Sequence, residues 1–360
     1  MARMFDELVL GIVDTVADYR RDDGVAITGD HVAAWATQFH GDDVLAVLRE
    51  TRAVLEARYV SKASAFDFLE SVLRELARQN SGSDLQRTLA ETAFLDIQVV
   101  GKSQGALLTM LDEIVGQYGY RVADCGGRAP KRYIYLDDVL CTGATLFRTM
   151  KSWWLAPDCS GFARQDSLPK NVTVQYVFIA LHRRYWSHVV HRFAFDTALL
   201  SRATPRMVSA ALRIQNDRSA TSALDFAFPR RVGLPRSAEL FFRSLNVSSS
   251  HFFREEERPA METLFTSAQG RNSFERAILA KGIEIVQSLG NDGLSGHPLG
   301  FTFAAEKSFG FGALVFTWRN VPNNSPLVFW HDAPQWTPLF KRRSASNIQP
   351  LATPSPVVPP

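Results

Sequence analysis

Two adjacent carboxylates followed by small, hydroxylic residues form the most distinctive chemical pattern in the sequence. The stretch from Arg132 to Leu146 reads RYIYLDDVLCTGATL, so an apolar run ends at Asp137 and Asp138 before a short loop. Small residues let backbone N–H groups approach an anion, and threonine hydroxyls add donors, so this loop suits a phosphate monoester. The loop residues are Cys141, Thr142, Gly143, Ala144 and Thr145.

Asp137 and Asp138 would repel a phosphate that touched them, because like charges at contact distance disfavour each other. Carboxylates instead accept strong hydrogen bonds from neutral hydroxyls. A phosphate beside two vicinal hydroxyls describes ribose 5-phosphate, which the pattern therefore predicts as the bound group. The alternative is structural, because loops of this composition start many helices and aspartates often cap them.

A second loop with binding character precedes the first by about one strand and helix. It consists of Gly101, Lys102, Ser103, Gln104 and Gly105. Lys102 supplies a positive charge, and Gly105 would allow close approach of the backbone to a ligand. The Gly-Lys pair resembles a nucleotide-binding P-loop, but the first glycine of that motif is missing, so we discount a P-loop NTPase. Lys102 as a solvated loop lysine remains the alternative.

Both loops lie where strands are expected to end and helices to begin. Strand-like runs cover Ala93–Val100, Tyr133–Val139 and Val172–Leu181, and helical runs cover Ala106–Val115 and Leu146–Leu155. This alternation predicts an α/β fold with a parallel sheet. Ligands in such sheets bind beyond the carboxyl ends of the strands, which is where both loops fall.

The spacing of apolar residues and the composition divide the chain into a core and flanking regions. We expect a helical N-terminal region over residues 1–90, because apolar residues there recur at three- and four-residue spacing. The α/β core covers 91–200, and a mixed helical and strand region integrated with it covers 201–342. Residues 343–360 are rich in proline and serine, which predicts a disordered tail. Within 201–342 the run Phe311–Trp330 is predicted to be rich in strands.

Composition favours a protein of the reducing cytoplasm. The chain of 360 residues carries 40 basic and 37 acidic side chains, and this net charge of +3 does not demand a nucleic-acid partner. Cys125, Cys141 and Cys159 are too few and too scattered for a disulfide framework or a four-thiolate zinc site. The N-terminus makes a poor signal peptide, and no apolar run is long enough to cross a membrane.

The run LDDVLCTGATL, Leu136 to Leu146, resembles the signature of type I phosphoribosyltransferases. In that family an acidic pair contacts the ribose hydroxyls of phosphoribosyl pyrophosphate, and a Thr-Gly-x-Thr loop holds its 5-phosphate. The resemblance implies that Asp137 and Asp138 are catalytic and that Gly101–Gly105 is the pyrophosphate loop. It also implies Mg²⁺, held through the ligand and water. This likeness covers about residues 92–195.

The longer frame resembles bacterial phosphoribosyltransferase-like proteins related to ComF and linked with conflict or anti-phage systems. The matching features are the helical N-terminus, Gly101–Gln104, Asp137–Gly143 and Arg319–Asn324. The implied fold is a type I phosphoribosyltransferase-like parallel sheet with a helical N-terminal region and a mixed C-terminal extension. The segment Ala123–Pro130 is short for the mobile hood that covers the site in many type I enzymes.

A basic segment follows the third strand. Arg183 and Arg184 stand beside aromatic residues, and they could bind pyrophosphate, an acceptor ring or RNA. A solvated basic helix face is the equal alternative. His182, His188 and His191 lack a carboxylate at ligand spacing, so a metal site there is weakly supported. The asparagines of Arg319–Asn324 fit an ordinary turn slightly better than a base-reading site.

Two functions remain open at this point. In the first, the protein is an enzyme that transfers or hydrolyses the phosphoribosyl group of phosphoribosyl pyrophosphate, acting in anti-phage defence. In the second, it is an inactive sensor that binds the same ligand or a nucleotide. The sensor would signal to a protein or RNA partner, which a defence operon would encode.

Overall fold

The computed structural model describes most of the chain. The described residues are 2–82, 84–128, 130–156, 173–195, 207–245, 252–289, 297–303 and 308–342. The predicted tail over 343–360 lies outside them. No helix within the described ranges is long and apolar enough to span a membrane.

A parallel sheet with strand order β2-β3-β4-β5 forms the centre of the α/β unit. The strands are β2 (Thr92–Phe94), β3 (Arg132–Leu140), β4 (Thr173–His182) and β5 (Met207–Ile214). Every neighbouring pair is parallel, so the predicted α/β class is confirmed. β3 and β4 are apolar along most of their length because helices cover both faces of the sheet.

The first strand is much shorter than the predicted Ala93–Val100. After Phe94, only the Leu95 N–H continues the ladder, donating to the Ile134 carbonyl at 2.8 Å. The next backbone N–H groups, of Ile97 and Gln98, donate to the side chain of Gln104 instead. This side chain therefore ends the strand and turns the chain toward the following helix.

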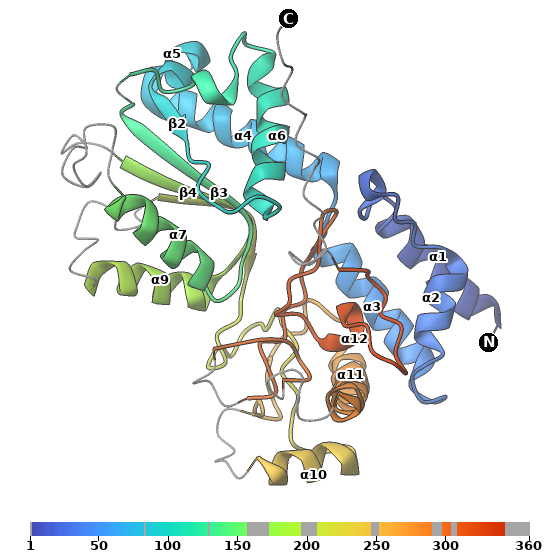
Figure 1. The fold of residues 1–360 in the computed structure, drawn as a ribbon. Helices are drawn as coiled ribbons and strands as arrows, with labels where there is room; N and C mark the ends of the chain where they lie inside the picture. The colour runs from blue at the N-terminus through green and yellow to red at the C-terminus, as the bar shows by residue number, and fades with distance from the viewer. Residues whose placement is uncertain are drawn as a thin grey trace, which may run out of the picture.

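Helices cover both faces of the sheet (Figure 1). Ile134 and Leu136 pack with α4 and α6 on one face, whereas Tyr135 packs with α7 and α9 on the other. This alternation follows from the two-residue period of a strand. The covering helices are α4 (Lys62–Ser81), α6 (Ser103–Gly116), α7 (Ala144–Leu155) and α9 (Arg183–Phe195), with α5 (Leu85–Ala90) beside α4.

The two ends of the chain combine in a second core beside the sheet (Figure 1). Trp35 stacks on Phe329 at 5.8 Å, and its indole N–H donates to the Val328 carbonyl at 2.9 Å. Residues nearly 300 apart in sequence therefore share one hydrophobic interior. Its helices are α1 (Ala2–Thr15), α2 (Gly29–Ala36), α3 (Val44–Arg58), α10 (Arg236–Ser244), α11 (Ala268–Ser288) and α12 (Leu327–Trp330).

A short parallel pair connects the second core to the α/β unit. β1 (Tyr59–Val60) pairs with β6 (Phe316–Thr317), and the Trp318 N–H continues the pairing by donating to the Val60 carbonyl at 2.9 Å. The prediction that Phe311–Trp330 is rich in strands is wrong, because β6 spans two residues and only isolated bridges accompany it. The apolar residues of this run are buried inside the protein. A short buried run has the same apolar composition whether or not it forms a strand.

A buried ion network fixes α11 to the chain before it. The Arg271 guanidinium pairs with Glu262 at 2.5 Å and with Glu275 at 3.2 Å, and it donates to the Leu224 carbonyl at 2.6 Å. Arg254 pairs with the same Glu275 at 3.1 Å. The side chains of Arg271 and Glu275 are 1% and 2% exposed, so each charge depends on its partners.

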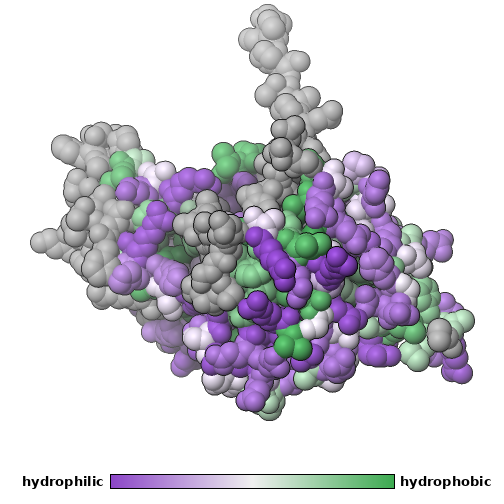
Figure 2. Space-filling view, turned by 90° about the horizontal axis from the view of Figure 1, so that it is seen from below, coloured by the Kyte–Doolittle hydropathy of each residue, from purple (hydrophilic) through white to green (hydrophobic). Residues whose placement is uncertain are grey.

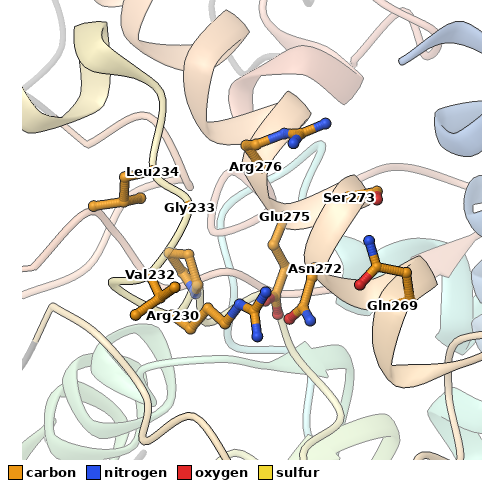
Figure 3. A pocket seen from close by; sticks show the side chains of 10 residues that line it. Arg230, Val232, Gly233, Leu234, Gln269, Asn272, Ser273, Glu275 and Arg276 are labelled. Atoms are coloured by element: carbon orange, nitrogen blue, oxygen red, sulfur yellow. The ribbon is translucent and has the colours of Figure 1, made fainter. Parts of the chain in front are cut away.

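Figure 3 shows the outer edge of this network, at a small pocket beside α11. Glu275 and Asn272 point from α11 toward Arg230, whereas Arg276 points the other way. Arg276 pairs with Asp43 at 2.8 Å, and its side chain is 46% exposed. The surface seen from below is mainly hydrophilic, with only small hydrophobic patches (Figure 2).

Arg271→Ala tests the network against Arg276→Ala, which removes the same type of residue from the same helix. We expect Arg271→Ala to cost about 3–5 kcal/mol, because Glu262 loses its counter-charge and the buried Glu275 keeps only Arg254. Arg276→Ala should cost less than about 1 kcal/mol, since its pair is partly solvated. Urea denaturation of both variants measures the difference. Similar costs would contradict the assignment of the network as a main support of α11.

Candidate functional site

A pocket of about 250 Å³ lies at the carboxyl end of β3. Both predicted loops contribute to it, together with a third segment, residues 319–324. The polar lining residues are Gln98, Lys102, Ser103, Asp137, Asp138, Cys141, Thr145, Arg319, Asn320, Asn323, Asn324 and Arg342, with Gly101 in the same wall. The two loops thus share one edge of the sheet, as the sequence predicts.

Asp137 is held by donors on every side. Its carboxylate accepts from the Ser103 hydroxyl, from the Gln98 amide at 2.8 Å, from the Tyr135 hydroxyl at 3.1 Å and from the Asp138 N–H at 2.9 Å. The residue is 7% exposed. Its oxygens are therefore committed to joining β3 to the Gly101–Ser103 loop, and few acceptor positions remain for a ligand.

Burial and the neighbouring Asp138 charge raise the pKa of Asp137 to about 7. The hydrogen bonds from Ser103, Asp138 and Gln98 act in the opposite direction, because they stabilise the carboxylate. Burial is the larger influence. Asp137 therefore titrates close to neutral pH, far above the usual range for an aspartate.

Asp138 presents its carboxylate to the pocket and to a cation. Its side chain is 18% exposed, and Oδ2 lies 3.5 Å from Arg319 Nη1. Arg319 Nη2 also donates to the Gly101 carbonyl at 3.0 Å, so one guanidinium contacts both predicted loops. Its buried Nε has no hydrogen-bond partner among the described residues. Asp138 is thus the carboxylate that a ligand can reach.

Three cationic side chains line the pocket: Lys102, Arg319 and Arg342. Lys102 is exposed, whereas Arg342 packs 5.1 Å above the ring of Trp330 and donates from Nε to the Val321 carbonyl at 3.0 Å. Burial lowers the pKa of Arg342. Sequence reasoning missed Arg342.

Gln104 and Gly105 of the second loop belong to helix α6 and do not line the pocket. The buried Gln104 accepts from Ile97 and Gln98 N–H groups at 2.7 and 2.9 Å and donates to the Leu136 carbonyl at 3.0 Å. Gly105 lies within α6 on its exposed side, with nothing within 4 Å of the place for a Cβ. Helix α6 begins at Ser103, earlier than predicted, which takes these residues out of the loop.

The predicted phosphate loop forms a tight entry into α7. Gly143 has φ 74°, and a Cβ at this position would overlap the Val189 side chain of α9. Thr142 Oγ1 accepts from the Ala144 N–H at 3.4 Å, and neither residue lines the pocket, whereas Cys141 and Thr145 do. Glycine is therefore required here both by its conformation and by the packing of two helices.

Cys141 is unsuited to act as a nucleophile. It is buried, and burial, reinforced by the charges of Asp138 and Asp137, raises the pKa of its thiol well above the usual value. A thiol in this state is neutral near pH 7 and therefore weakly reactive.

Arg183 and Arg184 lie outside the pocket, on the first turn of α9. His182 is buried, its Nδ1 lies 2.9 Å from the Leu140 carbonyl, and burial lowers its pKa to about 4. Tyr185 stacks on Phe311 at 4.9 Å within the core. The described residues contain no group of three side chains suited to holding a metal ion.

The segment expected to form a short hood lies elsewhere. The Gly126 N–H donates to the Leu89 carbonyl at 2.9 Å, and a Cβ at Gly126 would touch Ala93 at the start of β2. Residues 123–128 line no part of the pocket, which residues 319–324 border instead. The second core therefore supplies the wall that a hood would otherwise provide.

The pocket residues fall within one family match. The model of the PRTase-CE family matches residues 32–199 and 209–342. The chain belongs to this family. Comparison with curated proteins and with solved structures found no match. This match confirms the predicted resemblance to phosphoribosyltransferases. The matched ranges include both loops and residues 319–324.

Gly143→Ala should destabilise the protein by about 1–3 kcal/mol or more, since the new methyl group meets Val189 in a strained conformation. Gly105→Ala is the matched control, and we expect it to stabilise α6 by about 0.5–1 kcal/mol. Thermal denaturation of both variants measures these effects. Equal behaviour of the two variants would show that Gly143 is not constrained by α9.

The raised pKa of Asp137 predicts a dependence of stability on pH. The folded protein binds this proton more tightly than the unfolded chain, so wild-type stability falls as pH rises from about 4 to 7. Asp137→Asn removes this loss, so its stability relative to wild type should improve between pH 4 and 8 by up to about 4 kcal/mol. Urea denaturation across this pH range measures the change, with Asp96→Asn on the exposed loop as control. A constant difference between Asp137→Asn and wild type would contradict a raised pKa.

Proposed function

We propose that this PRTase-CE protein binds phosphoribosyl pyrophosphate, or a nucleotide carrying ribose 5-phosphate, in the pocket at the end of β3. The observation that carries the proposal is the convergence of Asp138, the Gly101–Ser103 loop and Thr145 on one pocket. A carboxylate suits the ribose hydroxyls, and a basic loop suits the pyrophosphate. The start of a helix suits the 5-phosphate. Family membership supports a ligand of this type.

Each part of the ligand has a suitable partner. The ribose hydroxyls would donate to Asp138, the more accessible of the two carboxylates. The 5-phosphate would accept from backbone N–H groups at the start of α7, near Thr145. Lys102, Arg319 and Arg342 would offset the charge of the pyrophosphate. Asp137 would act indirectly, by holding Ser103 and therefore the pyrophosphate loop.

The donor set fits Mg²⁺ that is held mainly by its ligand. The described residues offer no cluster of three metal-binding side chains, and the Asp137 oxygens already accept four hydrogen bonds. Asp138 remains able to accept from metal-bound water. Mg²⁺ bound to pyrophosphate and ribose oxygens, with water completing its shell, would neutralise charge on the leaving group.

The reaction we propose is transfer or hydrolysis of the phosphoribosyl group. The bond between the anomeric carbon and the pyrophosphate oxygen breaks, and its electron pair leaves with pyrophosphate. The Asp138 carboxylate stabilises the positive charge that develops on the sugar, and the three cations stabilise the leaving group. A nitrogen of an acceptor, or a water oxygen, forms the new bond to the anomeric carbon and loses a proton to solvent.

A sensor without turnover is the second candidate, and the Arg319 contacts favour it. Arg319 lies between Phe316 and Val321 of the second core, yet it contacts Asp138 and Gly101 across the pocket. A ligand that binds Asp138 and the Gly101 loop would compete with or reinforce these contacts. Occupancy would then alter how the second core meets the sheet, which is a route for a signal to a protein or RNA partner.

We assign either activity to bacterial anti-phage defence. The resemblance of the loops and of residues 319–324 to proteins of bacterial conflict systems supports this role. An enzyme would act there by consuming phosphoribosyl pyrophosphate or by modifying an acceptor, and a sensor by reporting nucleotide levels.

Asp138→Asn separates the enzyme from the sensor. The amide keeps the shape of the side chain but removes the negative charge, so we expect the ligand to bind while pyrophosphate release falls by about a hundredfold or more. Pyrophosphate release from phosphoribosyl pyrophosphate with Mg²⁺ is measured with water alone and with candidate acceptors. Asp96→Asn is the matched control and should release pyrophosphate like wild type.

Equal release by folded Asp138→Asn and wild type would contradict the catalytic role of Asp138. A wild type that binds the ligand but releases no pyrophosphate with any acceptor would identify the sensor.

A further inference from the structure

The two helices on one face of the sheet carry an unusual charge. Neither α7 nor α9 contains an acidic residue, yet together they carry five arginines and lysines. The net charge of the whole chain is only +3, so positive charge is concentrated on these helices. The basic residues are Arg148, Lys151, Arg183, Arg184 and Arg192.

The helices lie side by side and form one surface (Figure 1). Phe147 of α7 packs edge-on against Phe193 of α9 at 5.3 Å. Two cations flank the Phe147 ring at this seam, with the Arg192 guanidinium at 3.7 Å and the Lys151 ammonium at 5.9 Å from its centre. Cations from both helices therefore lie close together, around the same ring.

Arg148 and Arg183 extend this surface outward. Both residues are exposed, and within the described part of the chain neither guanidinium has an acidic partner. Hydrogen bonds from Ser219 lower the pKa of Asp217, and the nearby Arg184 also lowers it, so part of the Arg184 charge is offset. Arg148, Arg183 and Arg192 therefore carry positive charge that no acidic side chain of the described residues pairs with.

We propose that the face formed by α7 and α9 binds nucleic acid through its phosphate backbone. Guanidinium groups suit phosphate oxygens because they donate two parallel hydrogen bonds, and repeated cations match the regular charge of a nucleic-acid strand. Thr145, at the start of α7, lines the candidate pocket, so a strand on this face would pass beside it. The proposal does not require that the pocket catalyse any reaction.

The surface suits nucleic acid better than a membrane or a protein partner. Among the described residues of α7 and α9, Leu155 is the large hydrophobic side chain that stands exposed, at 38%. Insertion into a bilayer needs a broad apolar face, and the centre of a protein interface is depleted of charge. An acid-free pair of helices with little exposed apolar surface instead fits a hydrated polyanion.

Fluorescence anisotropy with labelled nucleic acid tests the proposal. The probes are a 20-nucleotide single-stranded RNA, the same sequence as single-stranded DNA, and the corresponding DNA duplex, titrated with the full chain over a series of salt concentrations. The test variant is Arg148→Gln/Arg183→Gln. The matched control is Arg236→Gln/Arg243→Gln, which removes two exposed arginines from α10, a helix of the second core.

We expect wild type to bind at least one probe and the Arg148/Arg183 variant to bind it about tenfold or more weakly. Loss of two phosphate contacts should also reduce the salt slope of the affinity, by about 1.4 for a single strand and about 1.8 for a duplex. The α10 control should retain wild-type affinity. Circular dichroism checks that both variants are folded, and Arg183→Gln alone should give an intermediate affinity.

Three results would overturn the proposal. One is a wild type that binds none of the probes at about 50 mM salt, where backbone contacts are strongest. Another is an equal loss of affinity in the α10 control. The third is binding to phosphatidylglycerol vesicles or to polyglutamate with no binding to nucleic acid, which would assign the surface to another polyanion.

Discussion

The guanidinium of Arg319 connects the two halves of the candidate site. It lies 3.5 Å from the Asp138 carboxylate and donates to the Gly101 carbonyl at 3.0 Å. The β1–β6 pair, which ends just before Arg319, fixes its backbone beside the sheet. Arg319 thus joins the loops of the α/β unit to the wall that residues 319–324 supply. The family match includes every segment that lines this composite pocket.

Two neighbouring aspartates acquire different properties from their surroundings. Asp137 is buried among donors, and burial brings its pKa close to neutrality, whereas Asp138 faces the pocket and a cation. Burial and charge thus divide the pair into a residue that positions the Gly101–Ser103 loop and a residue that a ligand can reach. Mutation of the two residues should therefore have separable effects on stability and on chemistry.

Much of the α/β unit was predictable because strand and loop chemistry are local. The run from Tyr133 to Val139 is apolar and followed by small residues, and it forms β3 with the expected loop and helix. The short β2 was not predictable, because it ends where the side chain of Gln104 accepts from the backbone N–H groups of Ile97 and Gln98. Local patterns carry no information on such a contact.

The family resemblance singles out residues 319–324 in the sequence, but their position opposite Asp138 could not be predicted from local patterns. Residues 319–324 have the composition of an ordinary turn, and only the packing of both chain ends into one core brings Arg319 over Asp138. Arg342 gave no sequence signal of its own. The sequence also could not show whether Arg183 and Arg184 reach the pocket. They lie on the first turn of α9 and do not line it.

Hydrogen–deuterium exchange with and without phosphoribosyl pyrophosphate and Mg²⁺ tests the central claim most directly. A ligand in the composite pocket should slow exchange in three separate segments at once: residues 99–105, 137–146 and 319–324. Protection in the third segment is decisive, because it belongs to the second core. Protection confined to other parts of the chain, or no protection at saturating ligand, would contradict the account.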